Sequence, residues 1–356
     1  MDSSSPFMIA WEQYWKTEPS SGESIAHTLF SDAAHFDDFQ FSELHKAYLG
    51  INNIGFDKLL AATSRNDLNA TDVQGRTVLS WAAGRGDYET TYRLLVAGAN
   101  PEIPSIDGWT ALHYAAEAPD VQCMEILLEF KADVNAPTLT RRTSLHLAVD
   151  NSTQPEKVKC LKKHGAELDT KTLNGWTPLQ RTFIQDSTSV AEQLLSMGAK
   201  CGMEDVNLAI QHNSHPILPL LLTHAGLDLE EDTEDDYCAF HHAAHYADLD
   251  TLKILSTSWP DTINLTARTS DGQTVLEAAK WRRDSNLEWS RENSQPLDEN
   301  SMLWYAAFED MVESIQDREK VVETPVDSER DDDEDIDDYF SSDETFSSPD
   351  EEDADF

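Results

Sequence analysis

The short pattern Leu-x-x-Ala returns along most of the chain at intervals of roughly 33 residues, and this periodicity limits the possible folds more than any other feature. A leucine and an alanine one helical turn apart form a narrow apolar face, and the small alanine lets a neighbouring helix approach closely. A unit of this length cannot bury its own apolar face, so it must stack on the next unit. The pattern therefore predicts a single elongated, all-α core. Its copies, some with one position substituted, are Leu44/Ala47, Leu79/Ala82, Leu112/Ala115, Leu145/Ala148, Leu179/Thr182, Val206/Ala209, Phe240/Ala243 and Leu276/Ala279.

Further features recur around this pattern. A glycine four residues before the leucine, such as Gly108, predicts a tight turn with positive φ, and a threonine two residues before it, such as Thr110, predicts an N-cap. A second apolar run that ends in a pair such as Leu127-Leu128 predicts a second helix, and a following Gly-Ala predicts its end. Each unit is therefore predicted to be a short hairpin followed by two helices.

Several segments carry these features together, among them Asp107-Gly-Trp-Thr-Ala-Leu-His-Tyr-Ala-Ala116 and Asn174-Gly-Trp-Thr-Pro-Leu179. They resemble ankyrin repeats, and the resemblance covers roughly residues 42–315. It implies a solenoid of stacked helix pairs with short hairpin loops. The resemblance is specific for the fold and says little about function.

Composition divides the chain into three regions. Residues 1–37 show no sustained period and are expected to be poorly ordered or partly helical. Residues 38–315 are expected to form an array of about eight units. Residues 316–356 are expected to be a disordered acidic tail, because 16 Asp and Glu face one Arg between Pro325 and Phe356 and repel one another.

Three departures from the repeat are visible within the array. Counted from Leu79, the fifth unit (from about Asp205) is degenerate, because it lacks the Gly-x-Thr signature and is short; its hairpin is expected to be missing. Arg141 stands where the third of these units would carry the turn glycine. The last unit carries an insertion at about 281–300, followed by a predicted capping helix over residues 301–315.

The chain is strongly acidic, with 67 Asp and Glu against 26 Lys and Arg and a formal net charge of −41. This balance argues against direct binding of nucleic acid or of an anionic membrane surface, since both need surplus positive charge. No stretch approaches the ~20 apolar residues of a membrane span, and the first residues lack the pattern of a secretory signal. The four cysteines form no CxxC pair, as expected of reduced thiols. An intracellular location, in the cytoplasm, the nucleus or both, is therefore expected.

No motif predicts catalysis, a cofactor or a metal site. The strings GxGxxG, GxxxxGK[ST], HExxH and GxSxG are all missing. His241, His242 and His245 lie close together and could present metal ligands. However, His241 shares the register of His113 and His146, where the resemblance implies a structural histidine bonded to the hairpin backbone. The chain is therefore interpreted as a non-enzyme.

Protein binding is the remaining interpretation. The resemblance implies that partners contact residues beside the hairpin glycines and after the Ala-Ala pairs, and Trp and Arg often dominate such interfaces. A tryptophan in the Gly-Trp-Thr register can equally be a packing residue of the hairpin, and both interpretations remain open. The candidate contacts are Gln74, Arg76, Arg85, Asp107, Trp109, Glu117, Arg141, Arg142, Asn174 and Trp176.

A basic island stands out in this acidic chain. Between Arg141 and Arg181, eight Lys and Arg face four Asp and Glu, and the core of the island is a helical segment with Lys157, Lys159, Lys162 and Lys163. One interpretation is a solvated helix surface. The other is a docking site for an acidic segment, from a partner protein or from the protein's own tail.

The tail mixes acidic with apolar residues, a composition typical of disordered activation segments, although a purely solubilising role is also consistent. Ser341 and Ser348 each precede an acidic residue by three positions, which makes them candidate phosphorylation sites. The favoured function is a non-catalytic scaffold or adaptor that recognises partner proteins through hairpin tips and the concave helix face, with the tail modulating binding. The alternatives are a transcription or chromatin regulator whose tail contacts co-regulators or basic proteins, and an accessory subunit of an enzyme.

Overall fold

The structure is a computed structural model, and it describes residues 40–52, 54–150, 155–224, 239–258, 268–269, 271–293 and 303–313. The predicted N-terminal segment (1–37), the acidic tail (316–356), Ser341 and Ser348 lie outside the described residues. Predictions about these parts of the chain therefore stay predictions.

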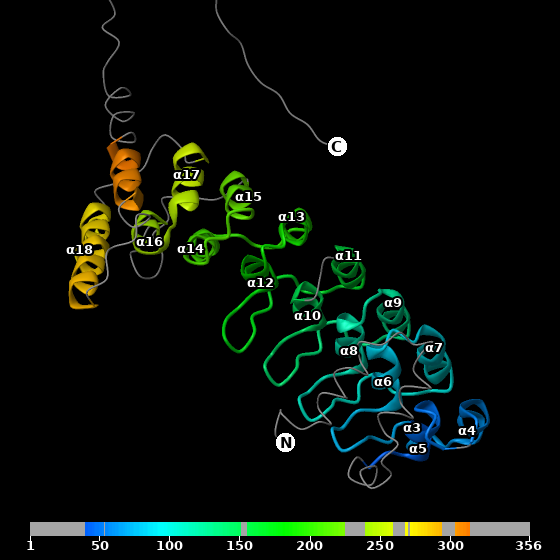
Figure 1. Cartoon of the computed structure of the whole chain (residues 1–356). Helices are drawn as coiled ribbons and strands as arrows, with labels where there is room; N and C mark the ends of the chain where they lie inside the picture. Colours follow the sequence, from blue (N-terminus) through cyan, green and yellow to red (C-terminus); the bar gives the residue numbers. More distant parts are fainter. Residues whose placement is uncertain are drawn as a thin grey trace, which may run out of the picture.

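The described residues form helices and two isolated β-bridges, and they contain no strand. The helices lie in two rows along an elongated stack (Figure 1). The inner row, next to the hairpins, contains α3 (Glu43–Tyr48), α6 (Val78–Gly84), α8 (Ala111–Glu117), α10 (Ser144–Asp150), α12 (Pro178–Gln185), α14 (Met203–Gln211), α16 (Ala239–Tyr246) and α18 (Val275–Asn293). The outer row contains α4 (Phe56–Ala62), α7 (Tyr88–Val96), α9 (Gln122–Glu129), α11 (Pro155–Lys163), α13 (Thr188–Ser196), α15 (Leu218–Thr223) and α17 (Leu249–Ser258), and the short helix α5 (Arg65–Leu68) lies between α4 and α6.

Neighbouring pairs share one core. Each inner helix from α6 onward packs on the next inner helix, and α7, α9, α11 and α13 pack in sequence in the outer row. The buried apolar residues form a continuous cluster that runs from Leu44 to Val312. The predicted all-α solenoid with a single elongated core is therefore confirmed.

The predicted caps are present at the starts of the inner helices. The hydroxyl oxygen of Thr77 accepts a hydrogen bond from the backbone N–H of Ser80, and that of Thr177 accepts one from Gln180. At Thr110 the cap is reciprocal, because the ring of His113 also accepts from the backbone N–H of Thr110. These bonds satisfy N–H groups that the first turn of a helix leaves unpaired.

A hairpin precedes each of α6, α8, α10 and α12, and these loops project from one side of the stack (Figure 1). Within each hairpin a residue of the first arm and one of the second are joined by a backbone hydrogen bond, as from Ser105 N to Trp109 O over 2.8 Å. The turn needs positive φ, and Gly108 has φ +79°. A Cβ at Gly108 would lie 2.8 Å from the backbone nitrogen of Leu139 in the next hairpin, so glycine is also required there for close approach.

The connection between α13 and α14 contains only residues 197–202 and forms no hairpin. A buried hydrogen bond takes over the contact that a hairpin makes elsewhere. Gln180 occupies the register of His113 and His146, and its Nε2 donates to Asp205 Oδ1 over 2.9 Å. Asp205 Oδ2 in turn accepts from the backbone N–H of Gly202 over 2.8 Å, which caps α14.

At the C-terminal end of the array, residues 281–293 of the predicted insertion are part of α18. A helix over residues 303–313 follows, and it buries Trp304, Phe308 and Met311 in the common core. Arg282 of α18 places its guanidinium 4.1 Å from the centre of the Trp304 ring. This last helix therefore covers apolar surface that the array would otherwise expose.

Candidate protein-binding surface

Successive hairpins are joined by single backbone hydrogen bonds. The N–H of Ile106 donates to Gln74 O over 2.9 Å, that of Leu139 to Asp107 O over 3.0 Å, and that of Leu173 to Thr140 O over 2.9 Å. The hairpins thus form a ladder along one side of the molecule.

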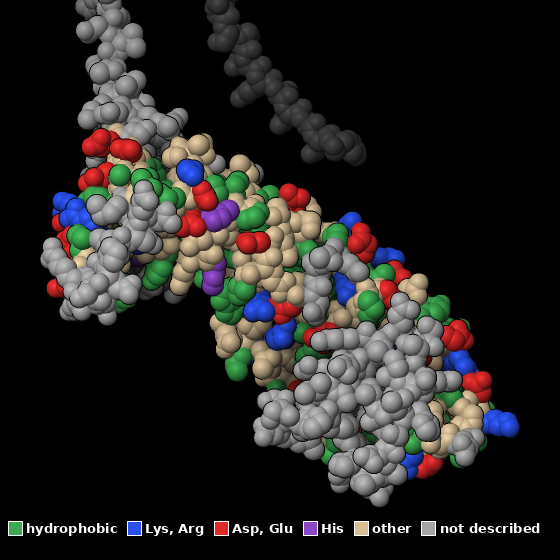
Figure 2. All heavy atoms as spheres, in the orientation of Figure 1, with side chains coloured by type: hydrophobic (Ala, Val, Ile, Leu, Met, Phe, Trp, Pro, Cys, Tyr) green, Lys and Arg blue, Asp and Glu red, His purple; other side chains and the backbone are tan. Residues whose placement is uncertain are grey.

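This ladder turns three large apolar side chains toward solvent. Ile106, Leu139 and Leu173, called here the apolar stripe, are 58%, 70% and 67% exposed. Figure 2 shows hydrophobic and basic side chains side by side over the hairpins that precede α10 and α12. Single exposed apolar residues are common, but several at the same register of adjacent repeats are typical of an interaction surface. These residues are not among the candidates from the sequence, although each lies two positions before Gly108, Arg141 or Gly175, a register that an alignment of the hairpins shows.

Arg141 lies beside the apolar stripe in an unfavourable backbone conformation. It has φ +58°, in the region that glycine occupies in the hairpins before α6, α8 and α12. A side chain in this region costs about 1 kcal/mol relative to glycine. The Arg141 side chain is exposed, and it forms no hydrogen bond or ion pair within the described part of the chain. The local strain therefore has no compensating contact there.

Arg142 is not a free cation. Arg142 and Arg181 flank the same carboxylate, Asp150 at the end of α10; Arg142 Nη2 pairs with Oδ2, and Arg181 Nε pairs with Oδ1 over 2.7 Å. Arg142 and Asp150 belong to one unit and Arg181 to the next, so the cluster holds α10, the hairpin before it and α12 together. Each arginine still keeps about 30% of its side chain exposed, which leaves a net positive charge beside the stripe.

The other candidate contacts, in the hairpins and at the end of α8, differ in their exposure. Asp107, Glu117 and Asn174 are exposed, and Gln74 is half-buried. The backbone carbonyls of Gln74 and Asp107 accept the hydrogen bonds that join the hairpins. Their side chains take no part in these bonds and stay available at the surface.

Arg76 and Arg85, expected from the sequence to contact a partner, are instead buried, with 8% and 4% of their surface exposed. Arg76 Nε pairs with Asp72 Oδ2 over 3.0 Å, and its guanidinium lies 5.0 Å from the centre of the Trp81 ring. Burial lowers the pKa of Arg76, while the charge of Asp72 raises it. Arg76 therefore braces its own hairpin.

The two hairpin tryptophans are both half-buried, so their two interpretations remain open. The Trp109 ring lies 5.2 Å from Tyr114 between ring centres and packs at the margin of the core. The Trp176 ring lies 5.7 Å from His212, which follows α14. Each tryptophan ring therefore packs against the protein on one part of its surface and is accessible to solvent on another.

The basic island is divided by the fold. Lys157 was expected on its surface and is instead 2% exposed, because its Nζ donates to the carbonyls of Ala116 and Ala118 at the end of α8. These carbonyls lack helical partners, and a cation is favourable at a helix C-terminus. Burial lowers the pKa of Lys157, opposed by nearby carboxylates. Lys159, Lys162 and Lys163 are exposed on α11 in the outer row, away from the hairpins (Figure 1).

The histidines in the repeat register are structural. His45, His113, His146 and His241 each donate from Nε2 to a backbone carbonyl of the following hairpin, over 3.1 to 3.3 Å. Burial lowers the pKa of His113 to about 4, so the ring is neutral at neutral pH. Among the described residues, no group of three or more His, Cys, Asp or Glu could hold a metal ion.

The thiols of Cys123, Cys160 and Cys201 are poor nucleophiles. Burial raises their pKa values to about 12, 11 and 12, so they stay protonated at neutral pH. Cys238 lies outside the described residues.

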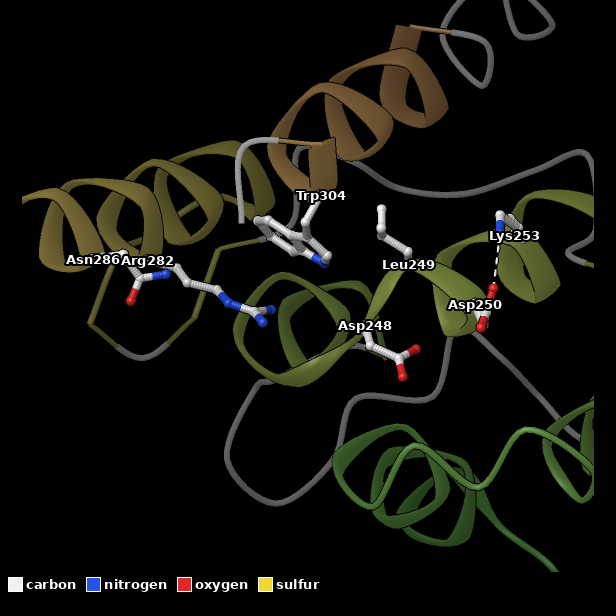
Figure 3. Close-up of a pocket in the computed structure, with 7 residues that line it drawn as sticks. All are labelled: Asp248, Leu249, Asp250, Lys253, Arg282, Asn286 and Trp304. Carbon is white, nitrogen blue, oxygen red and sulfur yellow. Dashed lines mark hydrogen bonds and ion pairs between the residues drawn. The ribbon is translucent and has the colours of Figure 1, made fainter. Parts of the chain in front are cut away.

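A pocket of about 400 Å³ lies near the end of the array (Figure 3). Its charged groups are already paired with protein groups: Asp248 accepts from His215 over 2.8 Å, Lys253 pairs with Asp250 over 2.8 Å, and Arg282 donates to the carbonyl of Ala247 over 3.0 Å. The bonds of Asp248 and Arg282 connect neighbouring units, and the Lys253–Asp250 pair lies within α17, so the pocket is a junction between helices. Its lining residues are Asp248, Leu249, Asp250, Lys253, Arg282, Asn286 and Trp304.

In the part of the chain that the structure describes, no helix has both the length and the apolar character needed to cross a membrane.

Comparison with known proteins agrees with this architecture. A family model described as ankyrin repeats (3 copies) matches residues 44–138 and 118–205. Among solved structures, the human ASB11 ankyrin repeat domain is 20% identical with a TM-score of 0.50, and the match covers 65% of this chain and 98% of that chain. The ankyrin repeat domain of Bcl-3, described as a unique member of the IkappaB protein family, is 21% identical with a TM-score of 0.51, and the match covers 58% of this chain and 95% of that chain.

No curated protein sequence matches the chain. At these identities the structural likeness concerns the fold alone. The family match, the periodic helix pairs and the hairpin ladder agree with one another: residues 44–205 match the ankyrin-repeat family, and the fold is an ankyrin-repeat solenoid.

Proposed function

We propose that this protein is a non-catalytic scaffold or adaptor that binds a partner protein along its hairpins and inner helices. Ankyrin repeats are generally modules of protein–protein interaction. The observation that supports this function most directly is the apolar stripe, in which Ile106, Leu139 and Leu173 stay exposed at the same register of adjacent hairpins. Burial of these side chains by a partner would contribute roughly 25 cal/mol for each Å² of apolar surface removed from water.

The proposal is tested by charging the stripe in the full-length protein. The double variant Leu139→Asp/Leu173→Asp changes two side chains that are largely exposed, so the fold should be retained. Val96→Asp on α7 is a matched control, because Val96 is 60% exposed but lies in the outer row. Quantitative affinity purification should show at least a tenfold loss of specific partners for the double variant and none for the control. An unchanged set of partners in the double variant would contradict the proposal.

The second function considered from the sequence, a transcription or chromatin regulator, depends on residues 325–356, which lie outside the described residues. It stays a prediction.

A further inference from the structure

The hairpin ladder ends at an open edge. The carbonyls of Gln74, Asp107 and Thr140 each accept an N–H from the next hairpin. The equivalent carbonyl in the hairpin before α12 is that of Asn174, and no N–H of the described residues reaches it. The reason is local, because the connection of residues 197–202 supplies no further hairpin.

The space beside this edge is free within the described part of the chain. A Cβ added at Gly75 or Gly108 would contact the following hairpin at 3.0 or 2.8 Å, whereas one at Gly175 would meet no described atom within 4 Å. Leu173, the last residue of the apolar stripe, lies directly before Asn174 and is 67% exposed. An extended segment can therefore approach the edge, donate an N–H to Asn174 and cover Leu173.

The charges around the edge select an acidic occupant. Arg141 is exposed and has no partner among the described residues, Arg142 and Arg181 share one carboxylate, and the exposed Lys171 comes directly before the last hairpin of the ladder. Carboxylates of an incoming segment would form charge-assisted hydrogen bonds with these groups. Such contacts would also give Arg141, in its strained conformation, a partner.

We propose that residues 332–340 of this same chain, Asp-Asp-Glu-Asp-Ile-Asp-Asp-Tyr-Phe, dock in extended form at the open edge. The segment offers carboxylates to the basic groups and Ile336, Tyr339 and Phe340 to the apolar stripe. The inference deepens the proposed function, because a docked tail covers the surface that a partner would use. The tail then acts as an internal competitor that a partner must displace.

The tether is long enough for this contact. Three steps between inner helices separate α12 from α18, which is about 30 Å at 8–10 Å a step. Residues 314–331 can span up to roughly 60 Å when extended. A flexible tether of this kind gives an effective concentration on the order of millimolar, so that modest contacts suffice.

The test uses full-length protein and amide chemical shifts in NMR. In one variant the six acids between Asp332 and Asp338 are replaced by their amides; in the matched control the five acids between Asp350 and Asp355 are replaced in the same way. The first variant should shift the amides of Leu139, Leu173 and Asn174, and the control should not. Unchanged shifts in the first variant would overturn the proposal, and equal shifts in both would overturn the choice of segment.

The reciprocal test changes the surface. Leu173→Asp should move the amide signals of Ile336, Tyr339 and Phe340 to their positions in a free peptide, whereas Val96→Asp should leave them in place. If the amide signals of these three tail residues do not change in Leu173→Asp, the proposal is overturned. Neither measurement requires an external partner, so it can fail while the purification experiment succeeds, and the reverse.

Discussion

The units before α12 and those from α14 onward use the same helix pairs but differ in their hairpins. In residues 71–177 four hairpins follow one another, and each of the last three is bonded to the one before. At the start of the second region, the short connection of residues 197–202 leaves α14 without a hairpin, and a described hairpin returns only at residues 268–274. Both regions nevertheless share one apolar core. The helix pairs thus continue the core through both regions, whereas the hairpins determine which surface is available to a partner.

The largest expected effect concerns the bond that replaces the missing hairpin. Asp205→Ala should lower the free energy of unfolding by about 2–3 kcal/mol, because the buried Gln180 amide and the Gly202 N–H would both lose their acceptor. Glu204→Ala, one residue earlier on α14 and exposed, is the control and should have little effect. Chemical denaturation measures both. Equal stabilities for the two variants would show that the second region does not depend on this substitute contact.

The next effect concerns the histidine that joins helix and hairpin in the first region. Burial lowers the pKa of His113 to about 4, whereas the unfolded chain has the ordinary value near 6.5. As the pH falls from 6.5 to 4, His113 becomes protonated in the unfolded chain but stays neutral in the folded chain. The free energy of unfolding therefore declines over this range. The loss from this residue should reach about 2 kcal/mol at pH 5.

Thermal unfolding between pH 7 and pH 5 measures this decline. His113→Gln should reduce the slope of the melting temperature against pH, because glutamine keeps hydrogen-bonding groups and does not titrate in this range. A slope that is the same in both proteins would show that His113 does not carry a pH-dependent share of the stability.

The smallest effect concerns Arg141. Arg141→Gly should raise the free energy of unfolding by about 1 kcal/mol, because glycine adopts φ +58° without strain. Lys131→Gly provides a matched control, since Lys131 has φ +68° at the end of a unit and lies outside the hairpins. Both variants should be more stable in denaturation, but only Arg141→Gly should also weaken partner capture. If both retain full capture, Arg141 is not part of the binding surface.

Most of the fold could be predicted from the sequence. The Leu-x-x-Ala period fixes which faces are apolar, and its regular return leaves stacking as the way to bury them. The threonine caps and the histidine register are local consequences of residue type, and both are confirmed at Thr110 and His113. The substitution of Gln180 and Asp205 for a hairpin contact was not predicted, because it joins two helices whose alignment depends on the length of the connection between them.

Much less of the candidate site could be predicted. Arg76, Arg85 and Lys157 are long polar side chains that a one-dimensional pattern places at the surface, but the fold brings acceptors or apolar rings within reach of Arg76 and Lys157. The pairing of Arg142 and Arg181 with Asp150 likewise joins residues of different units. The apolar stripe was visible in the sequence only as one position of a repeat, and its meaning depends on the exposure of that position.

The burial of Lys157 has a consequence for chemical modification. Its amino group donates to the last carbonyls of α8 and has almost no contact with solvent. An acylating reagent or an acetyltransferase can therefore reach this nitrogen only after α11 has separated from α8, while Lys159 two residues later stays reactive throughout. The ratio of labelling at Lys157 to labelling at Lys159 therefore measures how often the middle of the stack opens.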